Sequence, residues 1–180
     1  MPKTEDKLLY KGEYLSIYEK DGWYTYCRDR TGEIIGVLVF TKDKRGNIEK
    51  ILGRYEYDVQ TGEQKLTSIT GGVEEGQTPM ECAIVEMGEE SGFDVVEEDL
   101  IELGTMQPAK SEDTVIHLYA FDATGMEDMR REDSIGDGTK GEEDAYCDWV
   151  TFEDLVNMDN PVNHVAVLRL AQVESQSIFG

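Results

Sequence analysis

Three closely spaced glutamates form a group that could bind a metal ion. At about 100° per residue along an α-helix, Glu89 and Glu90 lie at about −60° and about +40° from Glu86, so the three carboxylates share one face. Like charges at this spacing repel by roughly 0.2–0.5 kcal/mol per pair, and no lysine or arginine occurs between Lys65 and Lys110 to offset them. Because Mg²⁺ and Mn²⁺ prefer carboxylate oxygens, the pattern predicts a metal site, with a solvated acidic helix face as the alternative.

A glycine-containing segment, residues 71–76, precedes these glutamates, and glycine lets the backbone approach a ligand or metal closely. Together they resemble the signature of the Nudix hydrolase family, G-x5-E-x7-R-E-U-x-E-E-x-G-U, in which U is an apolar residue. Seven of the nine defined positions match in register, and they are filled by Gly71, Glu86, Met87, Glu89, Glu90, Gly92 and Phe93.

Two positions depart from this signature. Gln77 stands where the family has glutamate, and Val85 stands where it has arginine. An arginine at position 85 could pair with Glu89, one helical turn later, and valine cannot. Because losing a contact that supports a metal ligand typically lowers metal affinity or activity by ~10–100-fold, we expect reduced efficiency with the three helix carboxylates intact.

The resemblance implies an α/β fold, namely a Nudix-type α/β/α sandwich with a mixed sheet and an N-terminal β region. It also implies hydrolysis of a nucleoside diphosphate linked to another moiety. In family terms Glu86, Glu89 and Glu90 would hold Mg²⁺ or Mn²⁺, with the carbonyl of Gly71 as a further ligand. The metal would polarise the pyrophosphate and activate a water molecule.

The resemblance further implies a glutamate from a late loop, acting as general base or extra metal ligand. Spacing from Trp149 favours Glu143 and then Glu142, and the alternative is an ordinary acidic surface loop. Glu112 is a weaker candidate. With Glu89, the two loop glutamates complete the set of catalytic candidates.

The chain length, the N-terminal β region and a strand ending in Arg54 resemble the ADP-ribose pyrophosphatase branch of the family. This implies that Arg54 contacts substrate phosphate or ribose and that the N-terminal strands form a homodimer. The substrate would be ADP-ribose or a similar nucleotide sugar, giving a nucleoside monophosphate. The alternative for Arg54 is a surface charge that pairs with Glu56 or Asp58.

The helix that must position the glutamates has clear boundary signals. Thr78 is a predicted N-cap with Pro79 at the first helical position and Glu81 at the third, which is a capping box. The helix should run from Pro79 to about Ser91 and end at Gly92. Its apolar positions are expected on the face adjacent to the carboxylates.

The rest of the chain predicts a mixture of strands and helices with no linker. We expect residues 1–33 to be an N-terminal β region and residues 34–180 to be the Nudix hydrolase domain. The segment 124–144, rich in glycine and acidic residues, is predicted to be a loop. Predicted strands cover 14–18, 23–27, 34–40, 48–57, 66–69, 103–106, 115–123 and 149–152, with later helices at 152–156 and 161–173.

The net charge of −22 constrains the partners. Residues 74–159 hold 26 acidic and 4 basic side chains, whereas the remainder holds 13 of each. This field disfavours binding to nucleic acid and requires a metal to bridge a phosphate substrate, so we expect a small-molecule nucleotide partner. Two alternatives stay open: a catalytically weak nucleotide-binding module, and an acidic mimic of nucleic acid that occupies a basic protein.

The cysteines and the lengths of the apolar runs predict where in the cell the protein is found. Cys27, Cys82 and Cys147 form no CxxC pair, which favours a reducing cytosol over a disulfide framework. Cys82 is expected within the carboxylate sector of the helix and inert. No apolar run approaches the ~20 residues that a membrane span needs, so we expect a cytoplasmic protein with no membrane partner.

Overall fold

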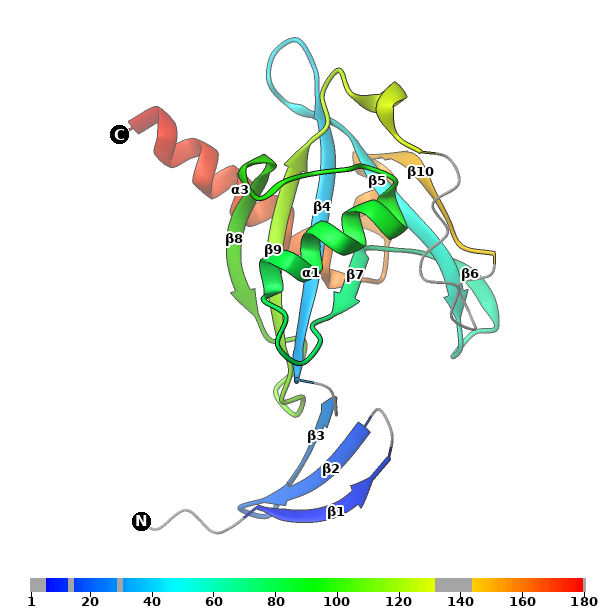
Figure 1. Cartoon of the computed structure of the whole chain (residues 1–180), viewed down its shortest axis with the longest axis vertical. Coiled ribbons are helices and arrows are strands. Elements are labelled where there is room, and N and C mark those ends of the chain that lie inside the picture. Colours follow the sequence, from blue (N-terminus) through cyan, green and yellow to red (C-terminus); the bar gives the residue numbers. More distant parts are fainter. Residues whose placement is uncertain (1–5, 13–14, 29–30, 132–143, 180) are drawn as a thin grey trace.

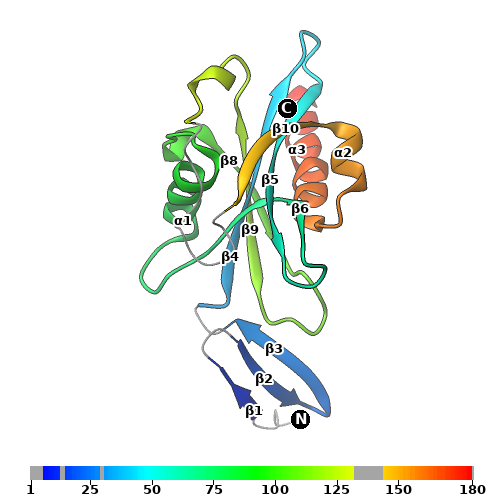
Figure 2. The ribbon, with the colours of Figure 1, turned by 90° about the vertical axis from the view of Figure 1, so that its right-hand side faces the viewer.

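The computed structural model describes residues 6–12, 15–28, 31–131 and 144–179. These residues form a layered sandwich in which one sheet lies between α1 on one side and α2 and α3 on the other, as Figure 2 shows. A separate small sheet lies at the lower end of the sandwich (Figure 1). The helices α1, α2 and α3 span Pro79–Glu86, Phe152–Asn157 and Pro161–Phe179.

The small sheet is antiparallel and contains β1 (Lys7–Lys11), β2 (Leu15–Lys20) and β3 (Trp23–Arg28) in that order. Between β2 and β3, Asp21 and Gly22 have φ values of 50° and 81°, the left-handed pair that a tight hairpin turn requires. The strands predicted at 14–18 and 23–27 are thus present and pair as this hairpin. β1 lies outside the predicted strands, because all 5 of its residues are exposed and show no alternation of burial.

The main sheet is mixed, with the order β10-β5-β4-β9-β8, and β6 pairs with β5 while β7 pairs with β4. β4 runs parallel to β9 and antiparallel to β5 and β7. The predicted α/β/α sandwich with a mixed sheet and an N-terminal β region is therefore confirmed. Strands β4 to β10 span Glu33–Lys42, Ile48–Asp58, Glu63–Thr67, Ile69–Gly72, Leu100–Met106, Val115–Asp122 and Tyr146–Thr151.

The central strand β4 explains how both faces of the sheet are covered. Successive side chains of a strand point to opposite faces. Val37 and Val39 accordingly join the apolar cluster that includes residues of α1, whereas Leu38 and Phe40 join the cluster that includes residues of α2 and α3. Burial on both sides accounts for the consecutive apolar residues Val37 to Phe40 in the strand predicted at 34–40.

The strand predicted over residues 66–69 is split in the structure. The buried Ser68 separates β6, which pairs with β5, from β7, which pairs with β4. The chain thus passes across the sheet at this point, and β7 packs beneath α1. This crossing brings Thr70 and Gly71 under the helix that carries the glutamates.

The helix begins as predicted and ends differently. The Thr78 side chain accepts from the Glu81 backbone N–H, and the Glu81 side chain accepts from Thr78, so the capping box is confirmed. The α-helix ends at Glu86, and Met87–Ser91 forms a single π-helical turn that Gly92 closes with φ of 80°. The prediction of a continuous α-helix to Ser91 is therefore wrong.

The orientation of α1 also corrects the expected place of its carboxylates. Cys82, expected among the carboxylates, is only 2% exposed and belongs to the apolar cluster together with Ala83 and Met87. Glu90 is buried on the same side at 4% exposure. Part of the expected carboxylate sector, Cys82 and Glu90, is therefore buried, whereas Glu89 is exposed.

The remaining elements are short or lie near the ends. Two 3₁₀ turns span Glu97–Asp99 and Glu127–Met129, and the second lies within the predicted loop, of which residues 132–143 fall outside the described residues. α3 continues past residue 173 to Phe179. Within the described part of the chain, no helix has the length and apolar character to cross a membrane.

The small sheet is attached to the sandwich through Tyr26. Its backbone bonds Ser111 and Asp113 in the loop between β8 and β9, at 3.0 and 2.8 Å. Its hydroxyl donates to the Glu112 carboxylate at 2.8 Å. Because β4 begins at Glu33, this junction lies close to the predicted domain boundary.

Candidate active site

Glu86, the last residue of α1, lies against the backbone of β7. A Cβ atom at Gly71 would overlap the Glu86 carboxylate, so only glycine leaves room for this approach. The position of Gly71 is set by the sheet, because β7 pairs with β4 and places Gly71 opposite Ile35. The first glycine of the signature therefore has a direct structural reason: its missing side chain leaves space for the Glu86 side chain against the strand.

Glu90 is held from two sides. One of its carboxylate oxygens, Oε2, accepts from the Thr70 backbone N–H at 3.1 Å, and the other, Oε1, lies 3.1 Å from Nε of Arg54. Burial raises the pKa of the Glu90 carboxyl well above its usual value, and the Arg54 guanidinium opposes this shift. The carboxylate of Glu86 raises the pKa further, which indicates that the two carboxylates are neighbours.

Glu89 differs from the other two glutamates because its side chain is exposed. The three carboxylates occupy the predicted stretch of chain but not one environment, and two of them lie on the π turn. A π turn is wider than an α turn, and such turns occur frequently at functional sites. Here the turn carries both Glu89, which is exposed, and Glu90, which is buried.

The π turn is held in place by a later segment of the chain. The Arg131 side chain donates through Nη2 to the Gly88 carbonyl at 2.9 Å, and its backbone N–H donates to the Gly92 carbonyl at 2.9 Å. The same side chain pairs with Asp94 at 3.2 Å. Sequence reasoning did not single out Arg131, although it is one of the four basic residues in the acidic stretch 74–159.

Arg54 lies on β5, and its side chain is fully buried. Besides Glu90, its Nε contacts Oε2 of Glu56 at 3.4 Å. The pairing with Glu56 that the sequence left open is present, but Arg54 is not a surface charge, and Asp58 pairs with Lys65 instead. A contact between Arg54 and a substrate stays a prediction.

Cys147 completes the buried surroundings of Glu90. Its Sγ donates to the Glu90 carbonyl at 3.2 Å, and it sits opposite Arg54 in the pairing of β10 with β5. Burial raises the pKa of the Cys147 thiol to about 11. Because the thiolate is the reactive form, this thiol is a packing group near neutral pH.

The structure explains one departure from the signature. The amide oxygen of Gln77 accepts from the Glu74 backbone N–H at 3.0 Å and so closes the loop before α1. An amide oxygen performs this bonding as a carboxylate oxygen would. Val85, the other departure, is 45% exposed on α1 and supplies no charge.

The late-loop candidates Glu142 and Glu143 lie outside the described residues. Glu112 is 8% exposed and bound to Tyr26 at the junction with the small sheet. That contact gives Glu112 a structural role in joining the two sheets.

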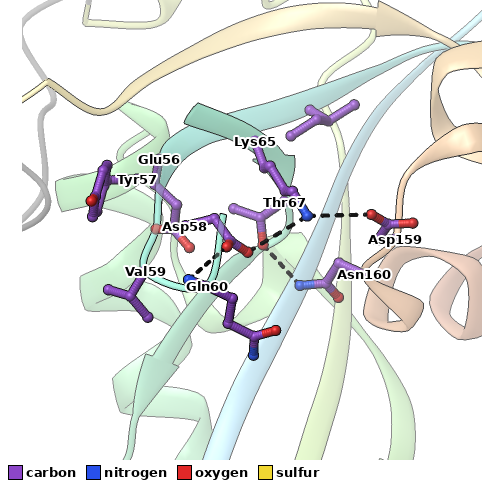
Figure 3. A pocket seen from close by; sticks show the side chains of 10 residues that line it. Glu56, Tyr57, Asp58, Val59, Gln60, Lys65, Thr67, Asp159 and Asn160 are labelled. Carbon is purple, nitrogen blue, oxygen red and sulfur yellow. Dashed lines mark hydrogen bonds and ion pairs between the residues drawn. The ribbon is translucent and has the colours of Figure 1, made fainter. Parts of the chain in front are cut away.

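A pocket of about 330 Å³ opens near the β5–β6 hairpin (Figure 3). Lys65 there pairs with Asp58 and Asp159, at 3.8 and 3.5 Å, and Asn160 donates to Thr67 at 2.8 Å. The charge of Lys65 is thus balanced within the pocket, which gives a phosphate little to bind. Glu56 lines this pocket and contacts Arg54, which in turn contacts the buried Glu90.

The donor set at β7 suits a hard divalent cation. Among the residues that the structure describes, no three acidic, histidine or cysteine side chains form a ready-made metal cluster. Glu86 and Glu90 do bring two carboxylates to the Thr70–Gly71 backbone, and oxygen ligands of this kind are what Mg²⁺ and Mn²⁺ take. The residues present therefore fit such an ion, and Glu86 and Glu90 are the side chains that would hold it.

Comparison with known families decides the relationship. The model of the NUDIX domain matches residues 31–170. The chain belongs to the Nudix family. The prediction of a Nudix pyrophosphohydrolase is thereby confirmed at the level of the family.

Two further comparisons place this Nudix protein among known proteins. Its fold is similar to a crystal structure described as that of an ADP compounds hydrolase, with a TM-score of 0.62, 16% sequence identity and 98% of each chain covered. The shared coverage includes the small N-terminal sheet, and at this identity the likeness concerns the fold. A comparison with curated protein sequences found no match.

Proposed function

We propose that this Nudix protein uses a divalent metal ion to hydrolyse a nucleoside diphosphate linked to a second moiety. The observation that carries the proposal is the packing of the Glu86 carboxylate on Gly71, beside the buried Glu90. The net charge of −22 adds support, because an anionic substrate needs cations to approach such a protein.

The proposed metal ligands are Glu86, Glu89, Glu90 and the carbonyl of Gly71, and the proposed cofactor is Mg²⁺ or Mn²⁺. When bound, such an ion neutralises the pyrophosphate and makes its phosphorus open to attack by water. The chain itself fixes the ligands: Gly71 admits Glu86 onto β7, and Thr70 bonds the Glu90 carboxylate.

A further carboxylate would take the proton of the attacking water. A general base must reach that proton within hydrogen-bond distance and should not be locked into other contacts. Glu143 and Glu142 of the late loop are candidates for this role, and Glu89, exposed on the π turn, is a candidate where it does not serve as a metal ligand.

The proposed substrate is ADP-ribose or a similar nucleotide sugar, with a nucleoside monophosphate and a phosphorylated remainder as products. Support comes from the fold shared over 98% of the chain with a protein described as an ADP compounds hydrolase.

We also propose that the protein is cytoplasmic and forms a homodimer through its small sheet. Five apolar or aromatic side chains of this sheet are between 43% and 68% exposed, which leaves apolar surface that a second subunit would cover. Light scattering of the purified chain tests the mass of the assembly. The five side chains are Leu8, Leu9, Tyr10, Trp23 and Tyr24.

The function is tested with a panel of nucleotide substrates, including ADP-ribose, in Mg²⁺ or Mn²⁺. Chromatography of the products should show a nucleoside monophosphate from the wild type. Glu90→Gln should lower kcat/KM by at least about 100-fold. Losing a group that only supports a metal ligand typically costs ~10–100-fold, and Glu90 is proposed as a ligand itself. Glu98→Gln, at an exposed glutamate of the 3₁₀ turn after the π turn, serves as the control.

Equal turnover by the wild type and Glu90→Gln would remove the helix carboxylates from the mechanism. Tight binding of a nucleotide by the wild type without hydrolysis would identify a binding module instead. If Glu98→Gln lowered kcat/KM as strongly as Glu90→Gln does, the loss would reflect the change in net charge alone.

A further inference from the structure

Arg54 occupies a place that the sheet fixes strictly. It lies within β5, opposite Thr67 of β6 on one side and opposite Cys147 of β10 on the other. Its side chain is fully buried, so the direction of the guanidinium follows from the backbone and its packing.

The guanidinium links two carboxylates of different elements. Nε lies 3.1 Å from Oε1 of Glu90 on the π turn and 3.4 Å from Oε2 of Glu56, two residues further along β5. The Arg54–Glu90 contact is almost completely excluded from water, since the side chains are 0% and 5% exposed. Such a contact keeps a defined geometry, in contrast to an exposed ion pair.

The same contact leaves Glu90 able to bind something else. Arg54 uses Oε1 and the Thr70 N–H uses Oε2, so both oxygens are fixed in direction. A carboxylate has about four lone-pair sites, and these two contacts use only part of them. Glu90 is thus held in a single orientation with acceptor capacity remaining.

The box position that carries arginine elsewhere in the family does not contribute here. Val85 is apolar and 45% exposed on α1. Arg131, which also reaches this region, donates to the Gly88 carbonyl and pairs with Asp94. Among the contacts of the residues that the structure describes, it is the Arg54 side chain that pairs with a glutamate of the signature.

We propose that Arg54 is a positioning residue: it orients the Glu90 carboxylate for a divalent cation and so provides, from β5, the support that Val85 cannot give. The inference rests on the proposed metal site. It assigns Arg54 a role that differs from direct contact with the substrate.

Mn²⁺ affinity separates these roles, because it is measured without substrate. Titration calorimetry with Mn²⁺ on the full chain should give a Kd roughly 10–100-fold weaker for Arg54→Met than for the wild type. Arg54→Lys, which keeps the charge, should give an intermediate value. At saturating Mn²⁺ the KM for ADP-ribose should change little in either variant, whereas kcat should fall.

A double-mutant comparison tests whether Arg54 acts through Glu90. In the Glu90→Gln background, adding Arg54→Met should change the Mn²⁺ Kd by less than about threefold, because coupled residues are not additive. The matched control is Arg169→Met, which removes an arginine that bonds the carbonyls of Leu103 and Thr105. That variant should lower the melting temperature and leave the Mn²⁺ Kd unchanged.

Two results would overturn the inference: wild-type Mn²⁺ affinity in Arg54→Met, with or without a raised KM, or an equal loss of Mn²⁺ affinity when Arg54→Met is added to Glu90→Gln. Should Arg54→Met fail to fold, the same comparisons are read from Arg54→Lys. Wild-type Mn²⁺ affinity in Glu90→Gln would instead contradict the proposed metal site itself, so the two failures are distinguishable.

Discussion

At the scale of single residues, the site depends on close approach between a helix and a strand. The Glu86 carboxylate lies where a side chain at Gly71 would be, and Glu90 lies on the adjacent Thr70 N–H. Both contacts involve β7, a strand of only 4 residues. Adding one carbon atom at Gly71 of this strand would therefore displace the Glu86 carboxylate directly.

Gly71→Ala tests this closeness. The added Cβ overlaps the Glu86 carboxylate, so that side chain must move away from β7. We expect Mn²⁺ affinity and kcat/KM to fall by roughly 10–100-fold, the usual cost of displacing a metal-site group. Calorimetry and the product assay measure the two quantities.

The control is Gly36→Ala on the neighbouring strand. A Cβ there would meet Val162 of α3 at 2.5 Å, on the opposite face of the sheet. This crowding should cost about 1–3 kcal/mol of folding stability and leave Mn²⁺ affinity unchanged. Equal losses of affinity in both variants would contradict the role given to Gly71.

At the scale of elements, α1 and the π turn after it position the chemistry. The capping box at Thr78 fixes where α1 begins, and the π turn fixes how Glu89 and Glu90 point. An error at the start of the helix would rotate all of its side chains relative to β7.

Thr78→Ala removes the side-chain cap. We expect a loss of about 1 kcal/mol in the free energy of unfolding, which denaturant titration measures. Thr78→Ser keeps the hydroxyl and should stay close to the wild type. Equal destabilisation by both substitutions would show that the cap does not act through its oxygen.

The capping box also has a defined pH dependence. Hydrogen bonds from the backbone and side chain of Thr78 lower the pKa of the Glu81 carboxyl. A lowered folded-state pKa gives stability above the unfolded pKa, and this stability disappears as the pH falls through the folded value. The stability difference between the wild type and Glu81→Gln should therefore shrink in acid below about pH 4.

The elements that local sequence determines were predictable, and those set by distant contacts were not. The capping box and the apolar run at Ile34–Phe40 lie within short segments, so their residues alone indicate the structure. The π turn and the burial of Arg54 depend on β7 and β10, which are remote in sequence. Spacing placed the three glutamates together but carried no information about which one faces the sheet.

At the scale of the whole molecule, charge and architecture act together. The sandwich buries Glu90 and Arg54 between α1 and the sheet, while the net charge of −22 surrounds the site with negative potential. Such a protein attracts cations and repels bare phosphates. Activity should accordingly require a divalent ion and vanish when a chelator removes it.

Anomalous scattering from crystals soaked in Mn²⁺ tests the central claim most directly. The account predicts an anomalous peak bonded to the carboxylate oxygens of Glu86 and Glu90, next to Gly71 on β7. The peak should disappear in crystals of Glu90→Gln prepared in the same way. A wild-type crystal with this place empty at saturating Mn²⁺, or with the ion bound elsewhere, would contradict the account.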